Sequence, residues 1–234
     1  MGAFHAAQGA AILALANDFA LPVTASFMDG PPGAAPPELT RLFEVRVAHW
    51  VAAFVFLSAL AHWILAGPAF GWYVKSLEKY RNYARWLEYS ISSSIMIVLI
   101  AMLTGIGDVA ALVALFGVNS SMILFGWLME KYEEPGNPSW LGYWFGVIAG
   151  AVPWIAIGIY LLSPTVDSSP PAFVYGIFIS LFIFFNTFAI NMVLQYKRIG
   201  PWRDYITGES VYVALSLVAK SALAWQVFGG TLAG

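Results

Sequence analysis

The chain has 234 residues, of which 60% are hydrophobic and only 10% are charged. Soluble domains carry about 25% charged residues, so this composition excludes an ordinary water-soluble domain and favours a membrane protein. The sequence contains no cysteine, which excludes disulfides and thiolate metal sites. The formal net charge of −2 says little about partners, and no nucleic-acid partner is expected.

Long apolar runs recur along the whole chain, and each is long enough for the roughly 20 residues that a helix needs to cross a bilayer. No cleavable signal peptide is expected, because the N-terminus lacks a basic segment and its apolar run is too long. The pattern predicts one all-α domain over residues 1–234, a bundle of seven transmembrane helices at 4–28, 45–68, 80–106, 109–131, 139–163, 171–196 and 206–231.

The predicted spans are separated by residues that end helices. The longest connection, 29–44, is rich in Pro and Gly, which argues against a helix there. It caps the bundle, mediates an interface or serves as a solvated linker. The breaks that separate the spans are Asp29-Gly30-Pro31-Pro32, Lys75 to Arg81, Gly105-Ile106-Gly107-Asp108, Glu133-Glu134-Pro135-Gly136, Ser163 to Pro171, and Lys197 to Asp204.

Basic residues are distributed unequally between the two sides of the predicted bundle. One side has only Arg41 and Arg46. Basic connections face the cytoplasm, so the N-terminus is expected inside and the C-terminus outside. The basic residues of the other side are Lys75, Lys79, Arg81, Arg85, Lys131, Lys197, Arg198 and Arg203.

A lone lysine, Lys220, lies in the middle of the last apolar run. A charge at this depth costs about 2.5–3.5 kcal/mol, which makes an intramembrane lysine a candidate functional residue. Converting the amine into a Schiff base with an aldehyde would lower that cost. Ser216 lies one turn earlier on the same helix face. The alternatives are a lysine that extends to the interface or a plain structural ion pair.

A buried cation needs an anion, and Glu88 is the best candidate among the few intramembrane carboxylates. Ser92, four residues later, faces the same way. Glu130 and Glu209 lie nearer the ends of their spans and are expected to reach water. The alternative is that Glu88 pairs with Arg85 at the membrane interface.

Two histidines, His5 and His62, also lie in apolar surroundings. A histidine near a carboxylate can accept a proton near neutral pH. The alternative is that each is simply hydrogen-bonded inside the bundle. No metal site is expected, because the histidines lack the spacing of metal ligands and no cysteine is present.

Two segments of the sequence resemble the heliorhodopsins. The first is 85–97, which contains Arg85-Trp86-Leu87-Glu88-Tyr89 and a run of serines, and the second is 216–226 around Lys220. The surroundings of His5 and His62 and the stretch 119–122 are also similar. The resemblance covers nearly the whole chain and implies the same inverted membrane orientation as the charge count.

The resemblance implies that all-trans-retinal is bound to Lys220 as a protonated Schiff base with Glu88 as counterion. Ser216 would hydrogen-bond near the Schiff base, and Ser92 and Ser93 would support the counterion. The further pocket candidates are Tyr89, Asn119, Met122, Ile123 and Trp225.

The family resemblance also implies a role for the two histidines. His5 and His62 would form a polar network on the cytoplasmic half that takes up a proton transiently. Family members are dimers, so a homodimer is expected.

The resemblance favours a light sensor of the cell membrane over a pump. Light-driven proton pumps carry a second carboxylate eleven residues after the first, where this chain has Leu99, and an Asp where it has Ser216. A slow photocycle with little or no ion transport is expected, read by an unidentified cytoplasmic partner. The alternative is a light-gated or light-driven ion transporter or channel. An enzyme ranks last, because no catalytic dyad is evident.

Overall fold

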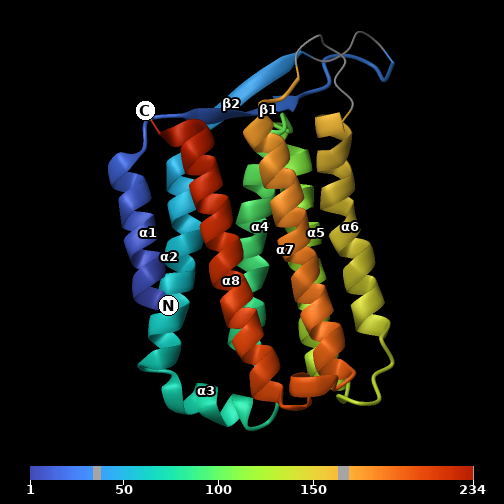
Figure 1. The fold of residues 1–234 in the computed structure, drawn as a ribbon. Coiled ribbons are helices and arrows are strands. Elements are labelled where there is room, and N and C mark those ends of the chain that lie inside the picture. The colour runs from blue at the N-terminus through green and yellow to red at the C-terminus, as the bar shows by residue number, and fades with distance from the viewer. Residues whose placement is uncertain (34–37, 163–168, 234) are drawn as a thin grey trace.

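The computed structural model describes residues 1–33, 38–162 and 169–233. Roughly aligned long helices form a bundle, with a β-hairpin across one end and a short helix across the other (Figure 1). The α-helices are α1 (Gly2–Leu15), α2 (Val47–Ala66), α3 (Phe70–Leu77), α4 (Tyr83–Leu103), α5 (Val109–Tyr132), α6 (Leu141–Leu162), α7 (Ala172–Tyr196) and α8 (Tyr205–Val227).

Six helices in the described part of the chain are long and apolar enough to cross a bilayer, namely α2, α4, α5, α6, α7 and α8 with its π-helical extension η2 (Phe228–Leu232). The helical membrane bundle predicted from the sequence is therefore confirmed. The N-terminal helix α1 has 14 residues, which correspond to ~21 Å at 1.5 Å per residue. It is shorter than the ~30 Å hydrocarbon core of a bilayer.

The predicted first span, 4–28, is wrong in its second half. Helix α1 ends at Leu15, and strand β1 (Ala20–Ser26) pairs antiparallel with β2 (Leu39–Arg46). The Asn17-Asp18 pair favours a turn, and β-branched Val23 and Thr24 favour a strand. Apolar content alone did not distinguish this strand from a continuing helix, because both bury similar side chains.

The β-hairpin caps one end of the bundle, as one of the three interpretations of residues 29–44 expected. Thr24 N–H donates to the Gly107 carbonyl over 2.8 Å, which ties β1 to the connection between α4 and α5. Asn17 N–H, just before β1, donates to the Leu232 carbonyl over 3.1 Å, which ties the start of the hairpin to the C-terminal turn. In Figure 1 the hairpin lies across the helix ends on the side of the C-terminus.

The other helices begin and end within a few residues of the predicted spans. The weakest predicted break, 105–108, is a real one: Gly105 has φ 100°, a conformation that favours glycine, and the Asp108 carboxylate caps α5 by accepting from Ala110 and Ala111 N–H. Part of the predicted break Ser163 to Pro171 lies outside the described residues. A 3₁₀ turn, η1 (Gly200–Arg203), connects α7 to α8.

Helix α4 is the centre of the bundle. Residues 96–102 are all hydrophobic and buried, and Ile97, Leu99 and Ala101 are fully inaccessible. At its other end, the Trp86 ring lies against Gly126 of α5, where a Cβ would come within 2.3 Å of the ring. The glycine therefore lets α5 approach the indole closely.

Gly126→Ala is expected to destabilise the protein by about 1–3 kcal/mol, because a methyl group would overlap a buried indole that has little room to move. The measurement is the thermal unfolding midpoint in detergent. Gly117→Ala on the same helix is the control, because a Cβ there meets no atom within 4 Å. An unchanged midpoint for Gly126→Ala would contradict this packing.

Candidate functional site

The only lysine of α8, Lys220, is buried in the middle of the bundle, with 3% of its surface exposed. Its Nζ lies 2.7 Å from Oε1 of Glu88 on α4. The two side chains are 4% and 9% exposed. The structure therefore brings together the two residues that the sequence singled out as a buried cation and its anion.

A serine that the sequence analysis missed completes this ion pair. Lys220 Nζ donates to Ser58 Oγ over 2.5 Å, and Ser58 Oγ donates to Glu88 Oε1 over 2.7 Å. Ser58 lies on α2, four residues before His62, so both share one helix face. That spacing from His62 is the feature of the sequence that could have identified Ser58, which is otherwise a small polar residue in an apolar run.

Ser216 lies one turn before Lys220 and is buried in the wall of the adjacent cavity. The hydroxyl within hydrogen-bond distance of Lys220 is that of Ser58, not that of Ser216. The Tyr89 ring also lies beside the amine, with Lys220 Nζ 5.1 Å from the centre of the ring. The Tyr89 hydroxyl donates to the Tyr212 carbonyl over 2.9 Å, which links α4 to α8.

Two neighbouring cavities lie on the side of Lys220 that faces α5 and α7. The first has a volume of about 60 Å³ and borders Lys220 itself. The second has a volume of about 290 Å³ and is walled mainly by apolar and aromatic side chains of α5, α6 and α7. Both share Tyr89, Met122 and Ile123 in their walls. The cavities are therefore neighbours, and the smaller one reaches the lysine.

The serines of α4 differ in their surroundings. Ser92 is fully buried, lines the cavity beside Lys220 and has no hydrogen-bond partner for its hydroxyl. Ser93 lines the same cavity, and its hydroxyl donates to the Tyr89 carbonyl over 2.7 Å. Asn119 on α5 donates to Ser93 Oγ over 2.8 Å and to Ser94 Oγ over 3.0 Å. These contacts join α4 to α5, and none of them reaches Glu88.

Trp225 lies apart from this site. Its indole N–H donates to Gln8 Oε1 of α1 over 2.9 Å, and 41% of its surface is exposed. It does not line either cavity. The structure therefore places it at the contact between α1 and α8, whereas Met122 and Ile123 line both cavities.

The histidines His5 and His62 stack on each other, with ring centres 5.9 Å apart and an angle of 14° between the rings. His5 is fully buried, and neither of its ring nitrogens has a hydrogen-bond partner. His62 lines a third cavity, of about 320 Å³, together with Ser58 and Glu88. The pair thus lies beside the carboxylate of the ion pair.

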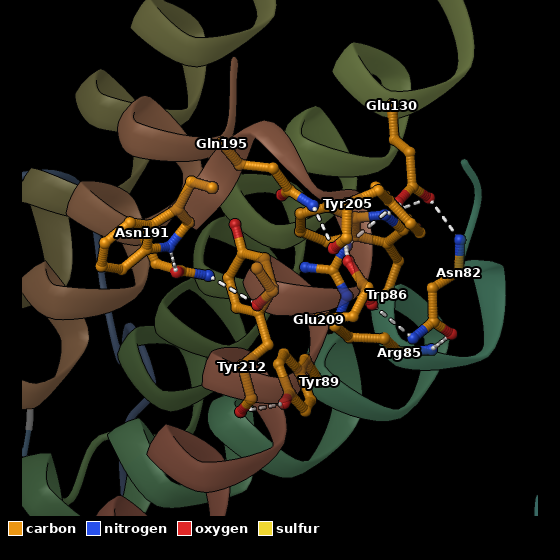
Figure 2. Close-up of polar contacts among 12 residues, drawn as sticks. Asn82, Arg85, Trp86, Tyr89, Glu130, Asn191, Gln195, Tyr205, Glu209 and Tyr212 are labelled. Carbon is orange, nitrogen blue, oxygen red and sulfur yellow. Dashed lines mark hydrogen bonds and ion pairs between the residues drawn. The ribbon is translucent and has the colours of Figure 1, made fainter. Parts of the chain in front are cut away.

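A second buried ionic cluster lies one turn from Glu88 on α4. Arg85 Nη2 lies 3.0 Å from Glu130 Oε1 and 3.1 Å from Glu209 Oε1. The Asn82 side chain donates to Glu209 Oε2 over 2.7 Å, and its backbone N–H donates to Glu130 Oε2 over 2.9 Å. Figure 2 shows these residues converging from α4, α5 and α8.

The expectation that Glu130 and Glu209 reach water is wrong. Their side chains are 4% and 5% exposed, because Arg85 turns into the bundle instead of toward the interface. Its guanidinium lies 4.0 Å from the centre of the Trp86 ring and 3.9 Å from that of Tyr212. In the described structure Arg85 pairs with these two carboxylates and leaves Glu88 to Lys220.

Aromatic donors complete the cluster. The Trp86 indole N–H donates to Glu130 Oε2 over 2.8 Å, and the Tyr205 hydroxyl donates to Glu130 Oε1 over 3.0 Å. Buried charges are tolerated only when they are paired and hydrogen-bonded. The cluster meets that condition around Glu130, but two carboxylates share a single guanidinium.

Arg85→Gln is expected to destabilise the protein by about 3–5 kcal/mol, because it leaves two buried carboxylates without a cation. Glu209→Gln is the matched variant, since it keeps the Arg85–Glu130 pair and removes one excess negative charge. Glu209→Gln should therefore destabilise the protein much less than Arg85→Gln. Thermal unfolding of both in the same detergent checks this, and equal losses would contradict the shared-guanidinium arrangement.

The arrangement offers a buried primary amine beside a carboxylate and an apolar space, which suits covalent attachment of a long apolar aldehyde. Among the described residues, no group of three or more histidines and carboxylates could hold a metal ion. In comparisons with known proteins, residues 1–232 match the family model named heliorhodopsin. No curated protein matches the chain.

Proposed function

The chain belongs to the heliorhodopsin family over nearly its whole length, and from this premise we propose that Lys220 carries all-trans-retinal with Glu88 as its counterion. Members of this family are non-enzymatic retinal photoreceptors in membranes. The single observation that supports the proposal most is the buried contact of 2.7 Å between Lys220 Nζ and Glu88 Oε1.

The site fits the retinal that the family implies. In the structure, the Lys220 ammonium stands in for the protonated nitrogen of a Schiff base. Retinal, condensed with this amine with loss of water, would supply visible absorption and light-driven isomerisation. The two neighbouring cavities beside Lys220, which share Tyr89, Met122 and Ile123 in their walls, are lined mainly by the apolar and aromatic side chains that suit a polyene.

Glu88 stabilises a positive charge on the nitrogen, because the carboxylate oxygen lies only 2.7 Å away. Ser58 contacts both partners and holds them in one geometry. Tyr89 lies over the amine with its ring face toward it, which further stabilises a positive charge. Removing any of these contacts would change the energy of the charged nitrogen.

The proton network proposed for the photocycle consists of His5 and His62. Its support is the position of His62 in a cavity that also contains Glu88 and Ser58. The unpartnered ring nitrogens of His5 provide a further proton-accepting position in contact with His62. A proton that leaves the site of Lys220 would be held there transiently.

A sensor with little or no ion transport is the output we propose. The buried hydrophobic residues 96–102 of α4 fill the half of the bundle toward the β-hairpin and leave no titratable side chain on that stretch. Leu99, in the position where pumps carry a proton donor, is fully buried. We further propose a homodimer in the cell membrane, with the N-terminus inside and a cytoplasmic signalling partner.

Expression with all-trans-retinal is expected to give a visible absorption band that Lys220→Ala lacks, because the variant cannot form the Schiff base. Hydroxylamine should bleach the wild-type band. The control is a folded Lys220→Ala protein with an unchanged helical circular dichroism spectrum. A wild-type protein that is folded and colourless would contradict the proposal.

Glu88→Gln is expected to shift the band to longer wavelength, because loss of the anion reduces stabilisation of the ground-state positive charge near the nitrogen. Ser58→Ala should shift it in the same direction by a smaller amount, since the carboxylate remains. Glu134→Gln, an exposed residue beyond the end of α5, is the control with the same charge change. A spectrum that is the same in wild type and Glu88→Gln would remove Glu88 from the counterion role.

A further inference from the structure

Helix α3 lies across the end of the bundle opposite the β-hairpin, at a steep angle to the long helices (Figure 1). It connects α2, which ends at Ala66, to α4, which begins at Tyr83. Because both neighbours cross the membrane, a short helix at their ends lies at the depth of the lipid headgroups and runs along the membrane surface.

The two faces of α3 differ in exposure. Tyr73, Val74 and Leu77 are partly buried toward the bundle. Trp72, Lys75 and Lys79 are exposed, and Trp72 is 50% accessible. Residues three apart share a helix face, so Trp72 and Lys75 lie on one face of α3, and Lys79 is exposed in the turn that follows the helix. We call these three exposed side chains the Trp72–Lys79 stripe.

The lysines of this stripe have no anionic partner among the described residues. None of the salt bridges in that part of the protein involves Lys75 or Lys79. Glu78 is exposed on the adjacent face of α3 and pairs with neither lysine. Arg81, three residues after Glu78, adds a further cation beside the stripe. Although Lys79 also lines a cavity with Glu133 and Glu134, the segment 72–81 itself carries more positive than negative charge.

An exposed tryptophan beside such cations is costly in water but favourable at a membrane interface, where aromatic rings lie at headgroup level. Basic side chains at this depth attract anionic lipids. We propose that the Trp72–Lys79 stripe binds the phosphate headgroup of an anionic phospholipid, with the indole inserted beside the glycerol backbone and the two ammonium groups on the phosphate.

The position of α3 gives this binding a structural consequence. The turn after α3 leads to Asn82, whose side-chain oxygen accepts from Arg85 N–H over 3.1 Å and thereby caps α4. The same residue contacts Glu130 and Glu209. A lipid bound to the stripe would restrain the segment that positions the first turn of α4.

The test is native mass spectrometry of the protein released from micelles that contain equal amounts of phosphatidylglycerol and phosphatidylcholine. Wild type should retain phosphatidylglycerol preferentially. Each lysine near an anionic surface strengthens binding about fivefold, so Lys75→Gln/Lys79→Gln should retain it roughly 30-fold less strongly. The measurement needs no chromophore, so its outcome is independent of the proposed photoreceptor function.

The control is Lys197→Gln/Arg198→Gln, which removes the same charge at the same end but leaves α3 and the turn after it intact. Lys197 and Arg198 are exposed where α7 ends. An equal loss in both double variants would overturn a defined site on α3. Equal retention of the lipid by wild type and Lys75→Gln/Lys79→Gln would also overturn the lipid site. The stripe would then be a candidate contact for a soluble partner instead.

A second measurement tests the indole. Brominated phosphatidylglycerol should quench more tryptophan fluorescence in wild type than in Trp72→Phe, because Trp72 is placed at the depth of the lipid. Equal quenching of the two proteins would contradict insertion of Trp72 into the interface.

Discussion

The rest of the structure depends on the buried contact between Lys220 and Glu88. Burying either charge without its partner would cost a large part of the protein's stability. The bundle therefore places a carboxylate of α4 against an amine of α8 and buries both. Ser58 brings a third helix, α2, into the same contact. The ion pair with its serine therefore fixes the positions of α2, α4 and α8 relative to one another. It also places the Lys220 amine in the wall of the apolar cavity.

Helix α4 divides the bundle into two chemically different halves. Its first three turns carry Arg85, Glu88 and the serines, and its last turns carry only buried hydrophobic side chains. The two ionic groups, Arg85 with its carboxylates and Glu88 with Lys220, lie one turn apart on this helix. A change in charge at Glu88 therefore acts on a segment that is already tied to α5 and α8, which suits a protein whose output is a change of conformation.

The sequence alone predicted the helical bundle and singled out both members of the central ion pair, because long apolar runs and the rare charges inside them are visible locally. Long apolar runs identify spans by length, and few charged residues lie inside those spans, so Lys220 and Glu88 stood out. The β-hairpin was missed because strand β1 is as apolar as the helix before it, and pairing with β2 depends on contacts distant in the chain. Ser58 was missed for a related reason, since its importance depends on α2 packing against α4 and α8. The exposure of Glu130 was misjudged because its partner, Arg85, turns inward.

The most direct test of the account is to reduce the illuminated pigment with borohydride and map the modified residue by peptide mass spectrometry. A retinyl group is expected on Lys220 and on no other lysine, because among the described residues Lys220 is the one buried amine beside both a carboxylate and an apolar cavity. An unmodified Lys220 in a coloured protein, or a retinyl group on another lysine, would contradict it.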